Sequence, residues 1–143
     1  MSQKFDNLKE EVLGHLKDQQ HILLATSEED QPRVRPVTLV CLDGKFWILT
    51  GTKNAKTQQI QKNPKIEFCL LFQKGENRGY IRVTAVAKII QNRETKVKIA
   101  KHTDFFDEFW EDPDDPNYTL MELHPSEIEY LRPKEMSVKR FTL

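Results

Sequence analysis

Hydrophobic residues recur at helical spacing in the first part of the chain. They fall three or four residues apart, and polar residues fill the gaps between them, which is the pattern of one apolar helix face. The apolar positions are Phe5, Leu8, Val12, Leu13 and Leu16. The pattern predicts an amphipathic helix over about residues 3–18. Helical patterns return over residues 55–61, with Asn54 as the expected N-cap, and over residues 93–102.

Most of the remaining chain consists of runs rich in β-branched and aromatic residues, which predict strands. Asp43-Gly44 is the clearest turn between two runs, because both residues tolerate a positive φ. Pro36 lies inside one run, and since proline cannot donate to a ladder, it predicts an edge position or a local break. The predicted strands cover residues 22–26, 33–42, 45–50, 65–73, 79–91 and 118–131.

About six strands in succession are too many for a doubly wound sheet and enough to close a small barrel. The chain has 143 residues, so one domain spanning residues 1–143 is expected. Lysine plus arginine and aspartate plus glutamate both number 22. This balance does not support a general nucleic-acid binder, which needs a positive excess.

Sequence features also bear on where the protein resides. No run approaches the roughly 20 apolar residues of a membrane-spanning helix, and residues 1–17 contain no apolar signal-peptide region. Cys41 and Cys69 both lie in apolar runs, where buried, reduced thiols are the expectation. We therefore expect a cytoplasmic protein without a membrane partner.

Motifs for metal binding or nucleophilic catalysis are missing from the sequence. The four histidines are far apart, and neither cysteine has a CxxC partner. No glycine-rich dinucleotide or P-loop motif occurs, and no serine lies in a nucleophile-elbow context. The sequence predicts no metal site and assigns no catalytic residue.

Basic residues and hydroxyls converge at one predicted sheet end. Arg33 and Arg35 share a strand face because side chains two apart point the same way. If the hairpin pairs the two strands, Lys56 meets Arg35 beside a helix N-terminus, which carries free N–H groups and partial positive charge. With hydroxyls from Thr50 and Thr52, this set would form a phosphate cradle. The alternative is that these cations are ordinary solvated charges on a barrel rim.

The order of these features resembles that of a known family. A strand arginine, a strand-end threonine, a helix-start lysine and an asparagine-proline before the next strand follow one another within residues 31–37, 46–51, 54–56 and 59–66. In this order the chain resembles the pyridoxamine phosphate oxidase-like, FMN-binding split-barrel superfamily, in its general-stress-protein branch. The resemblance extends from Glu10 to Pro133. It implies a mainly β fold with flanking helices, built on a six-stranded split β-barrel.

The resemblance also implies FMN as cofactor. Arg35 and Lys56 match the phosphate ligands, and residues 36–38 would run along the ring system. At a homodimer interface, Tyr80, Phe109 and Trp110 would reach the partner's flavin, although the aromatic cluster around Trp110 is equally well explained as core. The implied cofactor-binding residues are Arg33, Arg35, Pro36, Val37, Thr38, Leu49, Thr50, Gly51, Thr52, Lys56, Tyr80 and Trp110.

The implied reaction is hydride transfer to or from flavin N5, with a reduced nicotinamide or another small molecule as electron donor. The chain lacks the C-terminal tail with arginine and tryptophan by which true pyridoxamine phosphate oxidases hold their substrate. Val40 also stands where those oxidases tend to have lysine. Vitamin oxidation is therefore not expected. The alternatives are a non-catalytic flavin-binding stress or sensor protein, a split barrel that binds deazaflavin or haem, and an interaction module without cofactor.

Overall fold

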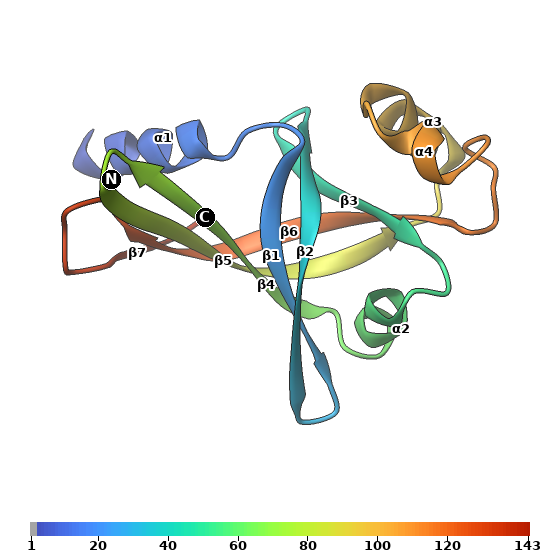
Figure 1. Ribbon diagram of the computed structural model, residues 1–143, viewed down its shortest axis with the longest axis horizontal. Helices are drawn as coiled ribbons and strands as arrows, with labels where there is room; N and C mark the ends of the chain where they lie inside the picture. The colour runs from blue at the N-terminus through green and yellow to red at the C-terminus, as the bar shows by residue number, and fades with distance from the viewer. Residues whose placement is uncertain (1–2) are drawn as a thin grey trace.

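The computed structural model describes residues 3–143, with side chains from Asn7 onward, so the side chain of Phe5 lies outside the described part (Figure 1). None of the helices within residues 3–143 is long and apolar enough to span a bilayer. The elements in chain order are α1 (Gln3–His15), β1 (Gln20–Glu28), β2 (Gln31–Leu42), β3 (Lys45–Gly51), α2 (Ala55–Lys62), β4 (Lys65–Lys74), β5 (Asn77–Ile90), α3 (Arg93–His102), α4 (Phe106–Phe109), β6 (Tyr118–Leu131) and β7 (Lys139–Thr142).

Six antiparallel strands form a closed ring. The sheet order is β3-β2-β1-β4-β5-β6, and a further pairing of β3 with β6 closes it. In that closure Phe46 lies opposite Leu123 and Gly51 lies opposite Tyr118. The predicted six-stranded split barrel with flanking helices is therefore confirmed.

A seventh strand was not predicted. β7 pairs with the second half of β6, where Phe141 lies opposite Ile128, and so it lies outside the ring. Its four residues include a single large apolar side chain, Phe141. This is too short a pattern for periodicity to reveal a strand.

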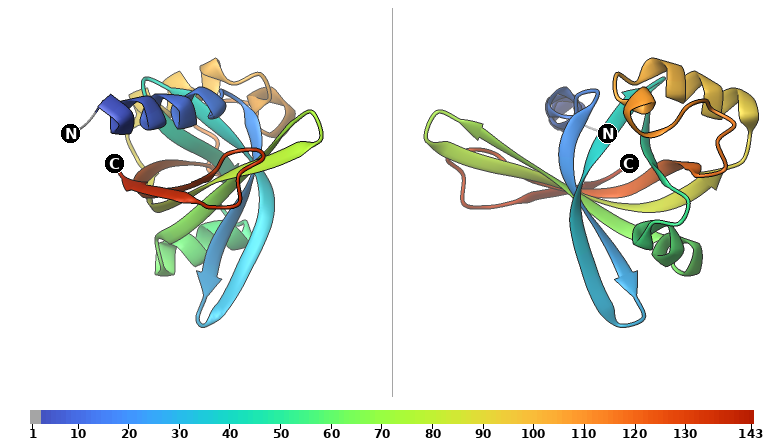
Figure 2. Two further views of the ribbon diagram at one scale, coloured as in Figure 1. Left: turned by 90° about the vertical axis from the view of Figure 1, so that its left-hand side faces the viewer. Right: turned by 45° about the vertical axis from the view of Figure 1, so that its right-hand side comes forward.

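Local sequence determines several features of the ring. Asp43 and Gly44 both have positive φ, 58° and 70°, as the hairpin prediction required. The first part of β2 pairs with β1, but only Val40–Leu42 pair with β3. Pro36 therefore lies where the other edge of β2 has no partner within the described chain, which satisfies the expectation of an edge or break. The tip of the β1–β2 hairpin projects beyond the barrel (Figures 1 and 2).

Two hydrophobic clusters hold the helices on the barrel. The larger one fills the ring, and α1 covers it by burying Val12, together with Leu16 just after the helix. Leu13, by contrast, is exposed, so only part of the predicted apolar face of α1 is used. The second cluster joins β3 and β6 to α3 and α4, with Trp47 and Phe106 among its members. It places the α3–α4 segment at the end of the molecule opposite α1 (Figure 1).

Gly79 is needed for close packing at the start of β5. A Cβ at this position would lie 2.6 Å from the carbonyl oxygen of Leu131 and 2.8 Å from the ring of Phe72. The Phe72 ring is itself stacked on His15, with centroids 4.2 Å apart, so it has little room to move. A side chain at residue 79 would push β5 away from β6.

We predict that Gly79→Ala lowers the free energy of unfolding by about 1–3 kcal/mol, the usual cost of overpacking. Gly14 in α1 is the matched control, because a Cβ there meets nothing within 4 Å. Gly14→Ala is expected to leave stability unchanged or to raise it by up to about 1 kcal/mol, since alanine favours helix. Urea unfolding measures both variants, and equal effects would contradict this description of Gly79.

Candidate functional site

A cavity of about 620 Å³ lies between β2, the end of β3, the start of α2 and the α3–α4 segment. It gathers residues from parts of the chain that are far apart in sequence. Of the predicted cofactor-binding residues, those that line it are Pro36, Val37, Thr38, Leu49, Thr50, Gly51, Lys56 and Trp110.

Arg35 lies next to this cavity and is held by two neutral acceptors. It is paired in register with Leu24 on β1, and its Nη1 donates to the Leu24 carbonyl oxygen at 3.1 Å. Its Nη2 donates to Oε1 of Gln59 on α2 at 2.8 Å. Gln59 is buried, and its Oε1 also accepts from the Thr26 hydroxyl. The guanidinium is therefore fixed between β1 and α2.

Lys56 is held where β3 passes into α2. Its Nζ donates to Oγ1 of Thr50 at 2.9 Å and to Oδ1 of Asn54 at 3.0 Å. The same Asn54 oxygen accepts from the Lys56 backbone N–H at 3.2 Å, which confirms Asn54 as the N-cap. The Thr57 hydroxyl donates to the Gly51 carbonyl oxygen at 2.8 Å and joins the helix start to the strand end.

Neither Arg35 nor Lys56 has a carboxylate partner among the described residues. Partial burial lowers the pKa of Lys56, and the nearby charge of Arg35 lowers it further. Burial likewise lowers the pKa of Arg35, with a second contribution from Arg33. Uncompensated cations that repel one another beside a helix N-terminus are stabilised by a bound anion. The arrangement is suited to a phosphate group.

Besides Arg35, three predicted residues do not line the cavity in the described chain. Arg33 is exposed and lies 3.6 Å from a carboxylate oxygen of Glu28. The Thr52 hydroxyl is used within the fold, because it contacts the Pro116 carbonyl oxygen and the Thr119 hydroxyl, both at 2.8 Å. Tyr80 lies near the start of β5, at the other end of the barrel from the cavity. Its hydroxyl donates to Glu129 at 2.7 Å.

Trp110 is a core residue that also lines the cavity. The residue is buried, its ring packs 5.2 Å from those of Phe106 and Tyr118, and its Nε1 donates to the Asn117 carbonyl oxygen at 3.0 Å. Trp110 therefore belongs to the second core cluster while also lining the cavity. The neighbouring Phe109 lines the same cavity and is 66% exposed, which makes it the accessible aromatic ring.

One wall of the cavity was not foreseen from the sequence. Gln19, His21, Asp104, Phe105 and Glu108 all line it. The register does place His21 opposite Thr38, so a correct pairing of β1 with β2 would have revealed that residue. The other four come from the loop after α1 and from the α3–α4 segment, which no motif connects.

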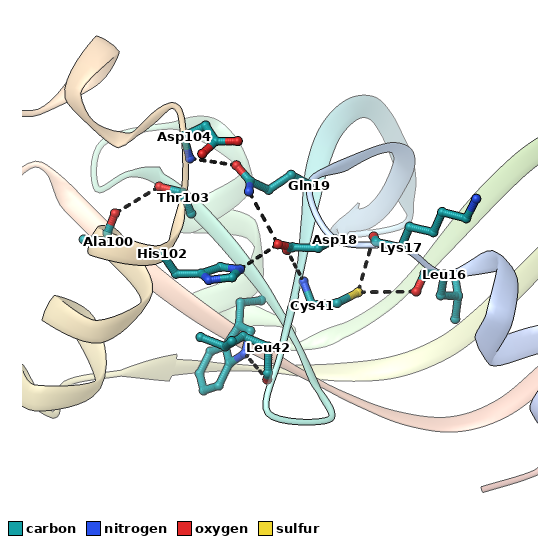
Figure 3. Close-up of polar contacts among 11 residues, drawn as sticks. Leu16, Lys17, Asp18, Gln19, Cys41, Leu42, Ala100, His102, Thr103 and Asp104 are labelled. Atoms are coloured by element: carbon teal, nitrogen blue, oxygen red, sulfur yellow. Dashed lines mark hydrogen bonds and ion pairs between the residues drawn. The ribbon is translucent and has the colours of Figure 1, made fainter.

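Polar contacts fasten this wall to the barrel (Figure 3). Nε2 of His102 lies 2.6 Å from Oδ2 of Asp18. The other oxygen of Asp18 accepts from the Cys41 backbone N–H at 2.9 Å. Oε1 of Gln19 accepts from the Asp104 backbone N–H at 2.7 Å. Burial would raise the pKa of Asp18, but the bonds from Cys41 and His102 outweigh it and leave that pKa lowered.

A larger cavity of about 840 Å³ lies at the opposite end of the barrel, between α1 and the β4–β5 hairpin. Its arginine, Arg132, is neutralised by Glu11 at 2.8 Å and by Glu135 at 2.9 Å. Arg35 and Lys56 have no such neutralisation. The smaller cavity is therefore the better candidate for an anionic cofactor.

Comparison with known proteins agrees with the fold and the sequence pattern. Residues 8–132 match the family model described as pyridoxamine 5'-phosphate oxidase. General stress protein 26 from Bacillus subtilis (strain 168) is 26% identical over 130 residues, which are 90% of this chain and 91% of that protein. The crystal structure of a nimc/nima family protein from Clostridium acetobutylicum has a TM-score of 0.78 and 25% identity, and covers all of both chains.

Two more distant structures share the fold and are described by a ligand. A pyridoxamine 5'-phosphate oxidase-related, FMN binding protein from Nostoc punctiforme has a TM-score of 0.69 and 16% identity, over 100% of this chain and 97% of its own. A heme binding protein from Mycobacterium smegmatis has a TM-score of 0.73 and 14% identity, over 87% of this chain and 53% of its own. At these identities the likeness extends to the fold alone.

Proposed function

This chain belongs to the pyridoxamine 5'-phosphate oxidase family, and we propose that its cavity binds FMN by the phosphate. The observation that carries the proposal is the pair Arg35 and Lys56, two partly buried cations that no carboxylate neutralises among the described residues. An anion is what this pair lacks, because a buried cation without a counter-charge is costly. The FMN binding protein from Nostoc punctiforme, which shares the fold, is consistent with a flavin phosphate in this role.

The remaining residues of the cavity fit the rest of the cofactor. Arg35, Lys56 and the start of α2 would hold the phosphate, and the Thr50 hydroxyl orients Lys56 through the bond at 2.9 Å. The edge of β2 over residues 36–38 and the side chain of Leu49 would flank the ring system. Arg33 and Thr52 would contribute to cofactor binding only indirectly. Arg33 adds positive charge near Arg35, and Thr52 holds the loop that precedes α2.

We further propose that the loaded protein is an oxidoreductase that takes a hydride from a reduced nicotinamide or another small-molecule donor. The flavin, when bound, supplies the redox chemistry itself. The protein contributes position and exclusion of water, through the wall that Gln19 and Asp18 fasten to the α3–α4 segment (Figure 3). A flavin-binding sensor that never turns over is the alternative.

Haem is the other cofactor that one observation favours. His21 lines the cavity and could ligate an iron atom, and a heme binding protein shares the fold. The unpaired cations favour the flavin, because a phosphate on a ligand placed at the start of α2 would satisfy both of them. Deazaflavin cofactors also carry a phosphate, which the same cations would serve.

We also propose that the protein is a homodimer whose second copy completes the cavity. The outer face of β1, β2 and β4 carries apolar side chains that nothing in the described chain covers, with Val34 68% and Leu71 65% exposed. Pro36 lies on this face and lines the cavity, while Tyr80 pairs in register with Leu71 on the same face. A self-complementary contact across the face would bring the partner's Tyr80 toward the cavity, as two-fold interfaces allow.

We predict that Arg35→Ala and Lys56→Ala each weaken FMN binding. A charge-assisted phosphate contact contributes about 1.5–3 kcal/mol, so each variant is expected to bind roughly 10- to 150-fold more weakly. Lys53→Ala and Lys62→Ala remove exposed cations outside the cavity and are expected to leave affinity unchanged. Fluorescence titration of FMN-free protein measures all four variants. Unchanged affinity in an Arg35→Ala/Lys56→Ala double variant would rule out the phosphate cradle.

The redox proposal predicts that the flavin-loaded protein loses its visible flavin absorbance when NADH or NADPH is added without oxygen. Free FMN at the same concentration is the control, and it should react far more slowly. Bound flavin that dithionite reduces but neither nicotinamide reduces would support the sensor alternative. It would also leave the FMN proposal intact, because binding is measured separately.

The homodimer proposal predicts a two-chain mass in sedimentation equilibrium. Leu71→Lys places a charge on the outer face and is expected to shift the protein toward single chains. Met136→Lys is the matched control, because Met136 is 98% exposed and lies outside that face. A single-chain mass for the unaltered protein at all concentrations would contradict the proposal.

A further inference from the structure

The two ends of the candidate cofactor cavity have opposite charge. Lys56 lies at one end, next to Arg35. His21 and Thr38 lie toward the other end, because they are paired in register three residues along the strands from the pair Leu24 and Arg35. At the rise of a strand, three residues span roughly 10 Å. Asp104 lies at this second end, because its backbone N–H donates to the side chain of Gln19, and Glu108 lines the cavity from the same α3–α4 segment.

Neither carboxylate has a counter-charge among the described residues. The side chains of Asp104 and Glu108 have no hydrogen bond or ion pair within the described residues, and both residues are exposed. The other titratable residues that line the cavity are His21 and Lys56. The nearby pair Asp18 and His102 is occupied with itself at 2.6 Å. The open end of the cavity therefore attracts positive charge.

Aromatic rings that line the cavity also indicate a cationic ligand. Phe109 is 66% exposed and lines the cavity, although a side chain of this size is normally buried. Phe105 stands edge-on to it, with ring centroids 6.5 Å apart and planes at 73°. Two aromatic faces at an angle favour a flat or quaternary organic cation, which the ring quadrupole attracts.

The wall that carries these groups is held in place. The Asp104 backbone N–H is bound to Gln19, and His102 is bound to Asp18, so both ends of the turn that leads into Phe105 are anchored to the loop after α1 (Figure 3). A fixed wall loses little entropy when a ligand binds. The carboxylates and rings are therefore arranged before the ligand arrives.

We propose that the acidic, aromatic end of the cavity selects a planar organic cation, such as a ring with a positively charged nitrogen, as the substrate that meets the cofactor. Phe109 and Phe105 contact its faces, and Asp104 and Glu108 neutralise its charge. The inference rests on the proposed function, because FMN is expected to fill the cationic end and to leave this end for the substrate. Flat anions of the same size are expected to be excluded.

Three pyridine ligands of similar size and different charge test the proposal. Calorimetric titration of FMN-loaded protein compares the cation 1-methylnicotinamide, neutral nicotinamide and the anion nicotinate at about pH 8, where an ordinary imidazole is neutral. The cation is expected to bind roughly three- to tenfold more tightly than the anion, the preference that two exposed charge contacts provide. Nicotinamide should fall between them.

Variants show whether the named residues cause the preference. Asp104→Asn/Glu108→Gln is expected to abolish it, while Glu76→Gln/Glu127→Gln, which removes two exposed acids outside the cavity, should keep it. Phe109→Ala should weaken all three ligands, and the cation most, whereas Met136→Ala should change none of them. Retention of the full preference in the Asp104→Asn/Glu108→Gln protein would overturn the proposal.

Flavin absorbance in the same samples separates the two proposals. A protein that takes up FMN and binds the three ligands equally, or prefers nicotinate, overturns the substrate inference and leaves the proposed cofactor standing. A protein that takes up no FMN overturns the proposed function, and the inference with it.

Discussion

The pairing of β3 with β6 is the contact on which the site depends. It closes the ring by placing Gly51 opposite Tyr118, and so it determines where the chain leaves β3 for α2. The same pairing brings Asn117 next to Thr52, whose backbone N–H donates to the Asn117 carbonyl oxygen at 3.0 Å. Trp110 is bonded to that carbonyl as well. Ring closure thus positions both the start of α2 and the aromatic wall at one cavity.

Arg35 and Lys56 lie at this position and are held there by neutral hydrogen-bond partners. Arg35 reaches across β1 to Gln59, while Lys56 is held by the strand-end Thr50 and the N-cap Asn54. All of these partners are neutral, so the positive charge at the helix start is preserved rather than cancelled. The wall on the other side adds acids and an exposed ring. A ligand that fills the cavity would meet cations, apolar side chains and acids.

Local patterns predicted the fold well because its elements are defined by nearby residues. The turn at Asp43-Gly44, the N-cap at Asn54 and the edge position of Pro36 each depend on a few neighbours. β7 was missed because Phe141 is its single large apolar residue and its pairing with β6 is a tertiary contact. The proximity of Arg35 and Lys56 could be predicted because a single hairpin and a short loop connect them.

The rest of the site required contacts that no local pattern encodes. Asp18 and His102 are 84 positions apart, and Gln19 and Asp104 are 85 apart, so only the folded chain shows that they form one wall. Thr52 was placed in the cradle from its position in the loop, but a hydroxyl there finds closer partners in Pro116 and Thr119. For Trp110, residue type alone could not separate a core position from a cavity position, and in the structure the residue is buried and also lines the cavity.

The central claim is that a flavin phosphate neutralises Arg35 and Lys56. The most direct measurement is the absorbance spectrum of the purified protein, together with the mass of the small molecule released when it is denatured. The account predicts a yellow protein that releases FMN in a ratio of one per chain. A Soret band with released haem, a deazaflavin mass, or a colourless protein that also fails to take up added FMN would contradict it.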